Sequence, residues 1–133
     1  LGISQLKKLP KFIDRRFEIA KKYDKSFENS IVKSLYIFDG KSSYHLYVVQ
    51  VEFSKLNITR EELFNNLRAK NIGIQLHYIP INKQPYYKTL GYGDESTPVM
   101  DKYYEECFSL PMYPLLSDDE QSYVIKSLFE VLR

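Results

Sequence analysis

The residues best suited to chemistry lie in one irregular stretch, HYIPINKQPYY, at residues 77 to 87. The stretch combines a histidine, three tyrosines and a glutamine with two prolines, and its pattern matches neither a helix nor a strand. Tyrosines offer flat apolar faces with a polar tip, and prolines lower the entropy cost of ordering a loop. Such a loop could bind a sugar or a nucleotide base. The residue types alone leave a second interpretation open, a proline-rich loop laid over a core.

His77 lies at the end of an expected strand at residues 72 to 78, where the irregular backbone begins. In sheets with crossover helices, the carboxyl ends of strands commonly form binding sites. The other histidine, His45, lies at the start of an expected strand at residues 44 to 53. We expect His45 to be a partly buried core residue, so His77 is the better candidate for a site.

Other kinds of chemistry find less support. A cysteine hydrolase would have to use Cys107, the one cysteine, which lies among apolar neighbours where cysteine usually acts as a small hydrophobic residue. A metal site needs three or four clustered ligands, and the sequence has no short-spaced pair. No phosphate-binding loop or dinucleotide glycine fingerprint is found. The acidic residues 118 to 120 are expected to cap a helix.

Length and composition indicate one globular domain, residues 1–133. The formal net charge of +2 is too small to predict nucleic-acid binding. The single cysteine is typical of a reducing compartment, and no apolar stretch approaches the roughly 20 residues that span a bilayer. We therefore expect a cytoplasmic protein without a membrane segment. The chain begins at Leu1, inside an amphipathic pattern, so we also expect a piece of a longer protein.

The periodicity along the chain predicts an α/β fold, a small sheet of three or four strands packed with helices. The spacing of strand, helix and strand over residues 44 to 78 suits a crossover connection. The segment SLP could add a short edge strand. We expect strands at 31–38, 44–53 and 72–78, and helices at 3–23 (interrupted by Pro10), 59–71, 98–108 and 117–132.

Four stretches, in this order and at compatible spacing, resemble one family. They are LGISQLKKL, YHLYVVQVEF, GIQLHYIPINKQPYY and SLPMYPLLSDDEQSYVIKSL. Together they resemble the C-terminal part of the DegT/DnrJ/StrS-type sugar aminotransferases, pyridoxal-phosphate (PLP) enzymes that place an amino group on nucleotide-linked keto-sugars. The sequence of the third stretch is most similar to the branch that acts on UDP-4-keto-6-deoxy-N-acetylhexosamines, as in pseudaminic acid synthesis.

This resemblance implies the C-terminal small domain of a fold-type I PLP aminotransferase, a homodimer that uses glutamate as amino donor for bacterial surface-glycan or flagellin-glycan synthesis. The Schiff-base lysine and the PLP contacts of the family lie in an N-terminal large domain, so this chain alone would lack both and would not transaminate. The small domain would supply part of the substrate pocket. The residues that match it are His77, Tyr78, Pro80, Gln84 and Tyr87.

An alternative from another class is a free-standing binding module. In that interpretation the tyrosine-rich loop would recognise a peptide or a single-stranded nucleic acid by stacking. It would be favoured if the chain were a complete gene product whose ligand binding depended on salt.

Overall fold

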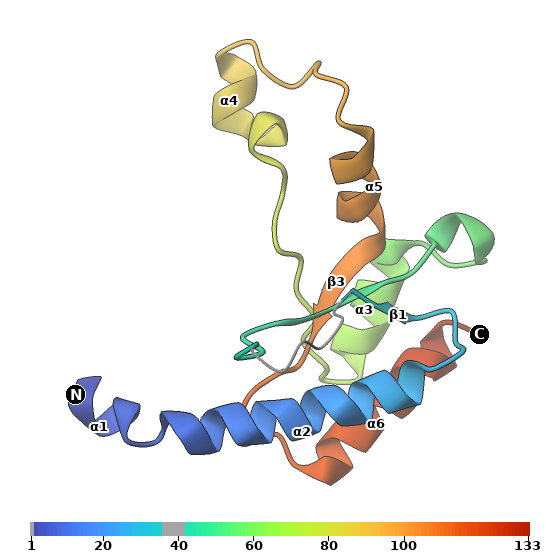
Figure 1. Ribbon diagram of the computed structural model, residues 1–133. Helices are drawn as coiled ribbons and strands as arrows, with labels where there is room; N and C mark the ends of the chain where they lie inside the picture. The colour runs from blue at the N-terminus through green and yellow to red at the C-terminus, as the bar shows by residue number, and fades with distance from the viewer. Residues whose placement is uncertain (1, 36–41) are drawn as a thin grey trace.

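A computed structural model describes residues 2–35 and 42–133 and contains a small antiparallel sheet with helices against it (Figure 1). The strands are β1 (Lys33–Ser34), β2 (Tyr47–Gln50) and β3 (Cys107–Leu110), in the order β1-β2-β3. Both pairings are antiparallel. The helices are α1 (Gly2–Leu6), α2 (Leu9–Phe27), α3 (Arg60–Ala69), α4 (Pro85–Thr89), α5 (Pro98–Glu106) and α6 (Asp118–Val131), with 3-10 turns η1 (Phe53–Lys55) and η2 (Ile81–Lys83).

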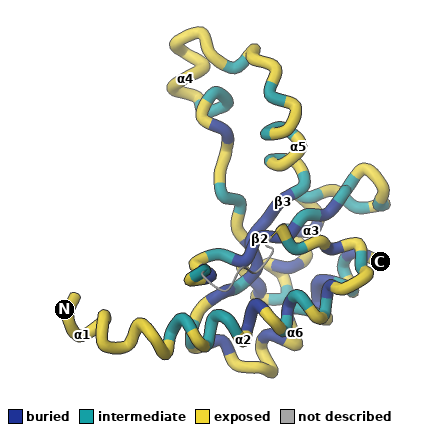
Figure 2. Tube along the Cα trace, in the orientation of Figure 1, coloured by how far each residue is buried: buried dark blue, intermediate teal, exposed yellow. Residues whose placement is uncertain are grey.

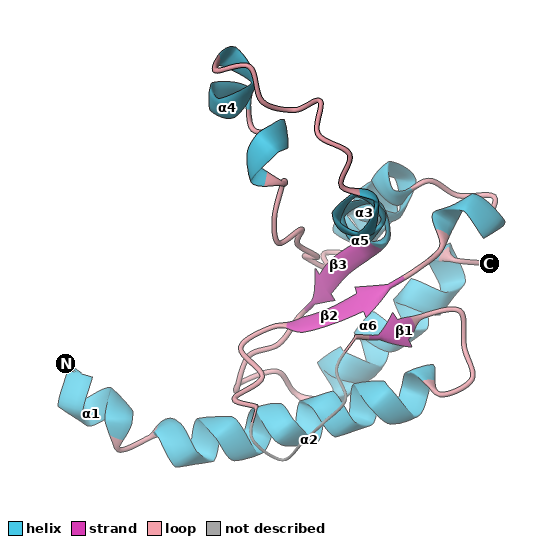
Figure 3. Ribbon diagram, turned by 45° about the horizontal axis from the view of Figure 1, so that its top comes forward, coloured by secondary structure: helices cyan, strands magenta, loops and turns pink. Residues whose placement is uncertain are grey.

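Helices α2 and α6 pack against each other, α3 packs against α6, and the strands lie beside them (Figure 3). The small sheet and the helices around it agree with the predicted fold class. Among the described residues, no helix combines the length and the apolar character needed to cross a membrane.

Two helices begin at capping boxes, each visible in the sequence as a Thr or Ser followed by Glu three residues later. The Thr59 hydroxyl accepts a hydrogen bond from the Glu62 amide, and the Glu62 carboxylate accepts one from the Thr59 amide. Ser117 and Glu120 form the same reciprocal pair at the start of α6. Each box satisfies two backbone donors that a helix start otherwise leaves without partners.

Two further helix boundaries also follow from local chemistry. Pro10 lies in the first turn of α2, where a missing N–H costs nothing, so the chain breaks into α1 and α2 just before it. Helix α3 ends through Asn71, whose φ of 59° is the left-handed conformation that closes many helices. The amide of Ile72 then donates to the Leu67 carbonyl at 2.9 Å.

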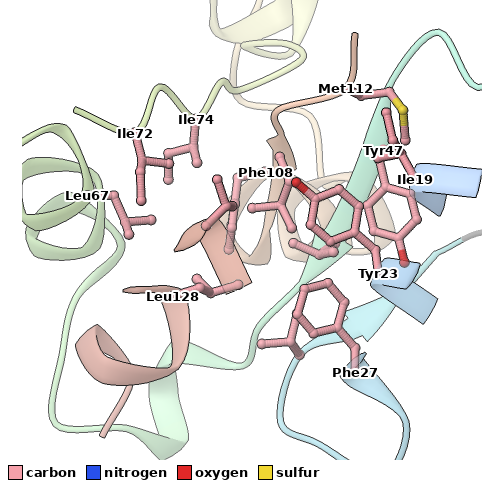
Figure 4. Close-up of a cluster of buried hydrophobic side chains, with 14 of the residues drawn as sticks. Ile19, Tyr23, Phe27, Tyr47, Leu67, Ile72, Ile74, Phe108, Met112 and Leu128 are labelled. Carbon is pink, nitrogen blue, oxygen red and sulfur yellow. The ribbon is translucent and has the colours of Figure 1, made fainter. Parts of the chain in front are cut away.

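The core lies between the sheet and the helices. Figure 4 shows Tyr23 and Phe27 of α2 beside Tyr47 of β2, and Phe108 of β3 facing the side of α3 and α6. The Tyr23 and Tyr47 ring centroids are 4.8 Å apart, and both residues are fully buried. The Tyr47 hydroxyl donates to Asp24 at 2.5 Å, and the Tyr23 hydroxyl donates to the Pro111 carbonyl at 3.0 Å. Both phenols are therefore buried with a hydrogen-bond partner.

The strand predictions for 31–38 and 44–53 were right in place but too long. In the region predicted as 31–38, only Lys33–Ser34 is strand, and residues 36–38 lie outside the described residues. The prediction for 44–53 shortens to Tyr47–Gln50. Ile31 and Leu35, which flank β1, are exposed. Beyond the strands the ladder continues through single backbone hydrogen bonds, from Leu35 to Val48 and from Val51 to Glu106, and composition alone does not reveal where it ends.

The predicted strand at 72–78 and its crossover connection were wrong. That segment makes a single antiparallel bridge, from Gln75 to Ser109, and does not form a strand. The predicted helix 98–108 ends at Glu106, and the chain continues directly into β3, which supplies the sheet's third strand. Ser109 and Leu110 of the expected edge segment SLP belong to a longer, fully buried strand, Cys107–Leu110, which ends before Pro111.

The buried tyrosines predict a loss of stability at alkaline pH. Burial raises the pKa of Tyr23, and burial together with the hydrogen bond to Asp24 raises the pKa of Tyr47. Above pH about 10, the unfolded chain releases these phenol protons while the folded chain keeps them. The free energy of unfolding should therefore fall as the pH rises above about 10. Urea unfolding at pH 8 and pH 10.5 measures the fall, which should be smaller in Tyr47→Phe than in the wild type. An equal fall in both proteins would contradict the contribution of Tyr47 to the alkaline loss of stability.

Candidate functional site

The candidate residues lie on an arm, residues 77–106, that leaves the body at His77 and returns to it at β3. The arm carries η2, α4 and α5, and α4 lies at its far end (Figure 1). Most of the arm is exposed (Figure 2). Many of its apolar and aromatic side chains are therefore exposed. An exposed apolar surface of this kind is typical of a region that contacts a partner or a ligand. The exposed members are Tyr78, Ile79, Ile81, Tyr86, Tyr87, Leu90, Tyr92, Val99 and Tyr103.

His77 is held at the root of the arm by β3. The backbones of Gln75 and Ser109 exchange two hydrogen bonds, of 3.2 and 2.7 Å. The ring nitrogen Nδ1 of His77 then lies 2.8 Å from the hydroxyl oxygen of Ser109, which is buried. His77 itself is half-buried. The ring is fixed through one nitrogen, which leaves Nε2 as the atom that can meet a ligand.

Tyr78 stands next to His77, with its ring at 89° to the imidazole and 4.8 Å between centroids. Its exposed fraction is 74%, so its face is open to a ligand or a protein surface. The peptide bond between the two residues is cis. Together they form a polar and aromatic pair at the root of the arm.

The other three predicted residues lie farther along the arm. Pro80 is buried, so its side chain offers no surface to a ligand. Gln84 is half-buried and donates from Nε2 to the Ile79 carbonyl at 3.3 Å. Tyr87 is 38% exposed and makes edge contacts with Tyr86 and Tyr92. The structure thus brings the candidates together in two groups, one at the root and one near the tip.

The sequence missed Ser109, although its distance to His77 makes it the partner that orients the imidazole. The one indication in the sequence that Ser109 lies in the sheet was the expected short edge strand at SLP. Residues 77 and 109 are far apart in the chain, and only the bridge from Gln75 to Ser109 brings them together.

Cys107 and His45 behave differently from catalytic residues. The Cys107 side chain is buried in β3, and burial raises the pKa of its thiol to about 11. The thiol is therefore protonated at neutral pH, and a cysteine nucleophile reacts as the thiolate. His45, predicted to be partly buried, is exposed, so that prediction was wrong. Within the described residues no group of three or more histidine, cysteine and acidic side chains could hold a metal ion.

A hollow of about 680 Å³ lies over the start of α3 and reaches the root of the arm through Leu76 and Glu105. Phe53, Leu56 and Phe64 line it, together with Arg60 and Glu62. Among the described residues that line it, none of the five candidates is found. The candidate loop is therefore a projecting surface, and a pocket at this loop would need a second wall from elsewhere.

Comparison with known proteins identifies the family. The sequence profile of the DegT/DnrJ/EryC1/StrS aminotransferase family matches residues 1–129. The chain belongs to this family. The resemblance drawn from the four sequence stretches is confirmed.

Individual relatives agree. The chain is 37% identical over 137 residues to the spore coat polysaccharide biosynthesis protein SpsC of Bacillus subtilis, covering all of this chain and 35% of that protein. It is 37% identical over 134 residues to a UDP-4-amino-4,6-dideoxy-N-acetyl-β-L-altrosamine transaminase of Campylobacter jejuni, covering 99% of this chain and 35% of that protein. In structure it is similar to Helicobacter pylori PseC, an aminotransferase involved in pseudaminic acid biosynthesis, with a TM-score of 0.90, 26% identity and coverage of 98% and 35%. The chain thus spans about a third of the length of these relatives.

Proposed function

We propose that this chain is the C-terminal small domain of a PLP-dependent aminotransferase. The enzyme transfers an amino group from glutamate to a UDP-linked 4-keto-6-deoxy-N-acetylhexosamine, for a bacterial surface glycan or flagellin glycan. The observation that carries the proposal is the family match over residues 1–129, joined to the 37% identity with an enzyme named an altrosamine transaminase. The family match also favours this function over the free-standing binding module.

The lysines of this chain argue that PLP is held elsewhere in the enzyme. A lysine that forms a Schiff base has to reach the cofactor in a pocket that excludes water. No lysine among the described residues is buried. The half-buried ones have other partners: Lys22 donates to Ser122, Lys70 pairs with Glu130, and Lys83 pairs with Asp101. We therefore place the PLP-binding lysine outside the described residues, and we expect the chain by itself to be inactive.

The arm is the part of this chain that we assign to the substrate. His77 offers a ring nitrogen, Gln84 an amide, and Tyr78 and Tyr87 aromatic faces with hydroxyl tips. Sugars and nucleotide bases are recognised by this mixture of stacking and hydrogen bonding. Because the arm projects, a second protein surface has to complete the pocket. We expect the cytoplasmic enzyme to be a homodimer, in which the second subunit would provide such a surface.

The proposal is tested with the full-length enzyme that contains this sequence. We expect bound PLP, and formation of 2-oxoglutarate from glutamate only when the UDP-linked keto-sugar is present. The coding sequence before Leu1 should encode the lysine that binds PLP. Binding of PLP without turnover of any nucleotide sugar would overturn the substrate class, and a start codon directly before Leu1 would overturn the assignment as a small domain.

A further inference from the structure

The two limbs of the arm are joined by polar contacts. Lys83 of η2 forms an ion pair with Asp101 of α5, and the Thr97 hydroxyl donates to the other carboxylate oxygen of Asp101 at 3.2 Å. The Lys83 ammonium also lies 5.8 Å from the centre of the Tyr104 ring, within the range of a cation–π interaction. We call Lys83, Thr97, Asp101 and Tyr104 the arm clamp.

The arm clamp is anchored to the body through α3. Arg60, the first residue of α3, donates a hydrogen bond to the Tyr104 carbonyl. Its guanidinium also lies 4.8 Å from the centre of the Tyr104 ring. The returning limb is therefore fixed to the body, and the outgoing limb is fixed to the returning limb through Lys83.

A second connection lies toward the tip. One carboxylate oxygen of Glu95 accepts hydrogen bonds from the Gly93 amide at 2.8 Å and from the Asn82 side chain at 3.3 Å. Gly93 has a φ of 118°, and a Cβ there would lie 3.3 Å from the Asn82 carbonyl oxygen. Glycine therefore allows the two limbs to approach closely at this point.

Polar contacts matter in the arm because apolar burial contributes little there. Helices α4 and α5 and the turn η2 contain no buried residue. Only small apolar areas are removed from water, so the usual stabilisation of about 25 cal/mol per Å² is largely missing. The shape of the loop from His77 to Tyr87 then depends on contacts of the kind that Lys83 makes.

We propose that Lys83 and Asp101 are positioning residues that hold the loop 77–87 in the shape that binds the nucleotide sugar. This inference rests on the proposed function. Lys83 lies between the root group, His77 and Tyr78, and the tip group, Gln84 and Tyr87, so one contact sets the position of both. Its hydrogen bond to Asp101 also lowers the pKa of that carboxyl, which keeps the carboxylate ionised at neutral pH.

The test uses Lys83→Met and Asp101→Asn in the full-length enzyme, with two readouts. Amide hydrogen exchange over residues 77–92 should become faster, while exchange in β2 and β3 stays unchanged. The KM for the UDP-linked keto-sugar should rise about fivefold with little change in kcat, the equivalent of about 1 kcal/mol for a partly exposed ion pair. Because the two residues form the same contact, the double variant should show no faster exchange and no higher KM than either single variant.

Two further variants are controls. Lys102→Met removes an exposed lysine of α5 whose ion pair, with Glu52 of the body at 3.9 Å, does not join the two limbs of the arm, so both readouts should match the wild type. Lys83→Arg keeps a cation that can meet Asp101 and Tyr104, so it should restore most of the protection and most of the sugar affinity.

Faster exchange with an unchanged KM would overturn the proposal, because the arm clamp would then be only structural. Unchanged exchange would overturn it as well. If the arm clamp variants raise both exchange and KM while His77→Ala does not change KM, the positioning role stands and the proposed contact of His77 fails. An enzyme that rejects the nucleotide sugar contradicts the proposed function, and the exchange readout then decides separately whether the arm clamp orders the loop.

Discussion

Replacing His77 by alanine in the full-length enzyme is expected to raise the KM for the UDP-linked keto-sugar about tenfold or more, with bound PLP unchanged. The reason is geometric. The hydrogen bond of 2.8 Å between Nδ1 and the Ser109 hydroxyl orients the ring and leaves Nε2 for a ligand. Loss of one ligand hydrogen bond together with one ring contact corresponds to about 1.4 kcal/mol or more, which is a factor of about ten. Steady-state kinetics with the keto-sugar and the absorbance of bound PLP measure the two quantities.

The other histidine provides a matched control. His45 lies before β2 and is exposed, so His45→Ala should leave the KM unchanged. Ser109→Ala removes the partner of the imidazole but keeps the ring, and a smaller increase in KM is expected. If His77→Ala lowers stability and leaves the KM unchanged, the histidine serves only to attach the loop. The second interpretation from the sequence, a proline-rich loop over a core, would then be correct.

The elements that could be predicted from sequence are those decided by local chemistry. Thr59 and Ser117 cap helices because their partners, Glu62 and Glu120, lie three residues away. Pro10 breaks a helix through its own ring and its missing N–H. In each case the interaction that fixes the boundary lies within one helical turn, where a single sequence displays it.

The strands could not be predicted to the same extent, because a strand needs a partner from a distant part of the chain. Residues 72–78 have the composition of a strand, yet only Gln75 pairs, and its partner is Ser109. Cys107–Leu110 follows a helix without any turn residue between them, so its composition resembled the end of that helix. Its place beside β2 becomes visible only in the pairing of the two strands, for example of Val49 with Phe108.

The same distinction applies to the site. Residue types alone marked the loop that carries His77 and Tyr87 as a candidate, because histidine, tyrosine and proline are concentrated in it, but they left a loop over the core as a second interpretation. The contacts that order the loop were not recognisable. Lys83 meets Asp101 across 18 positions and His77 meets Ser109 across 32. A lysine and an aspartate at such a separation carry no signal in a single sequence, since most charged residues lie on a solvated face.

The largest loss of stability is expected from Tyr47→Ala. Tyr47 is fully buried at the centre of the core, with the rings of Tyr23 and Phe27 at 4.8 and 6.5 Å. Removing a buried aromatic ring costs about 3 to 5 kcal/mol, because the apolar area returns to water and a cavity remains. Urea unfolding of the 133-residue chain, followed by far-UV circular dichroism, measures the change.

Tyr47→Phe separates the ring from its hydroxyl. This variant keeps the ring contacts and removes only the hydrogen bond to Asp24, which is half-buried and can be rehydrated, so a loss of about 1 kcal/mol is expected. Tyr86→Ala removes an exposed tyrosine from the arm and should change the free energy of unfolding by less than about 0.5 kcal/mol. If Tyr47→Phe is as destabilising as Tyr47→Ala, the bond to Asp24 and not ring packing joins β2 to α2. The core would then depend on a polar contact, as the arm does.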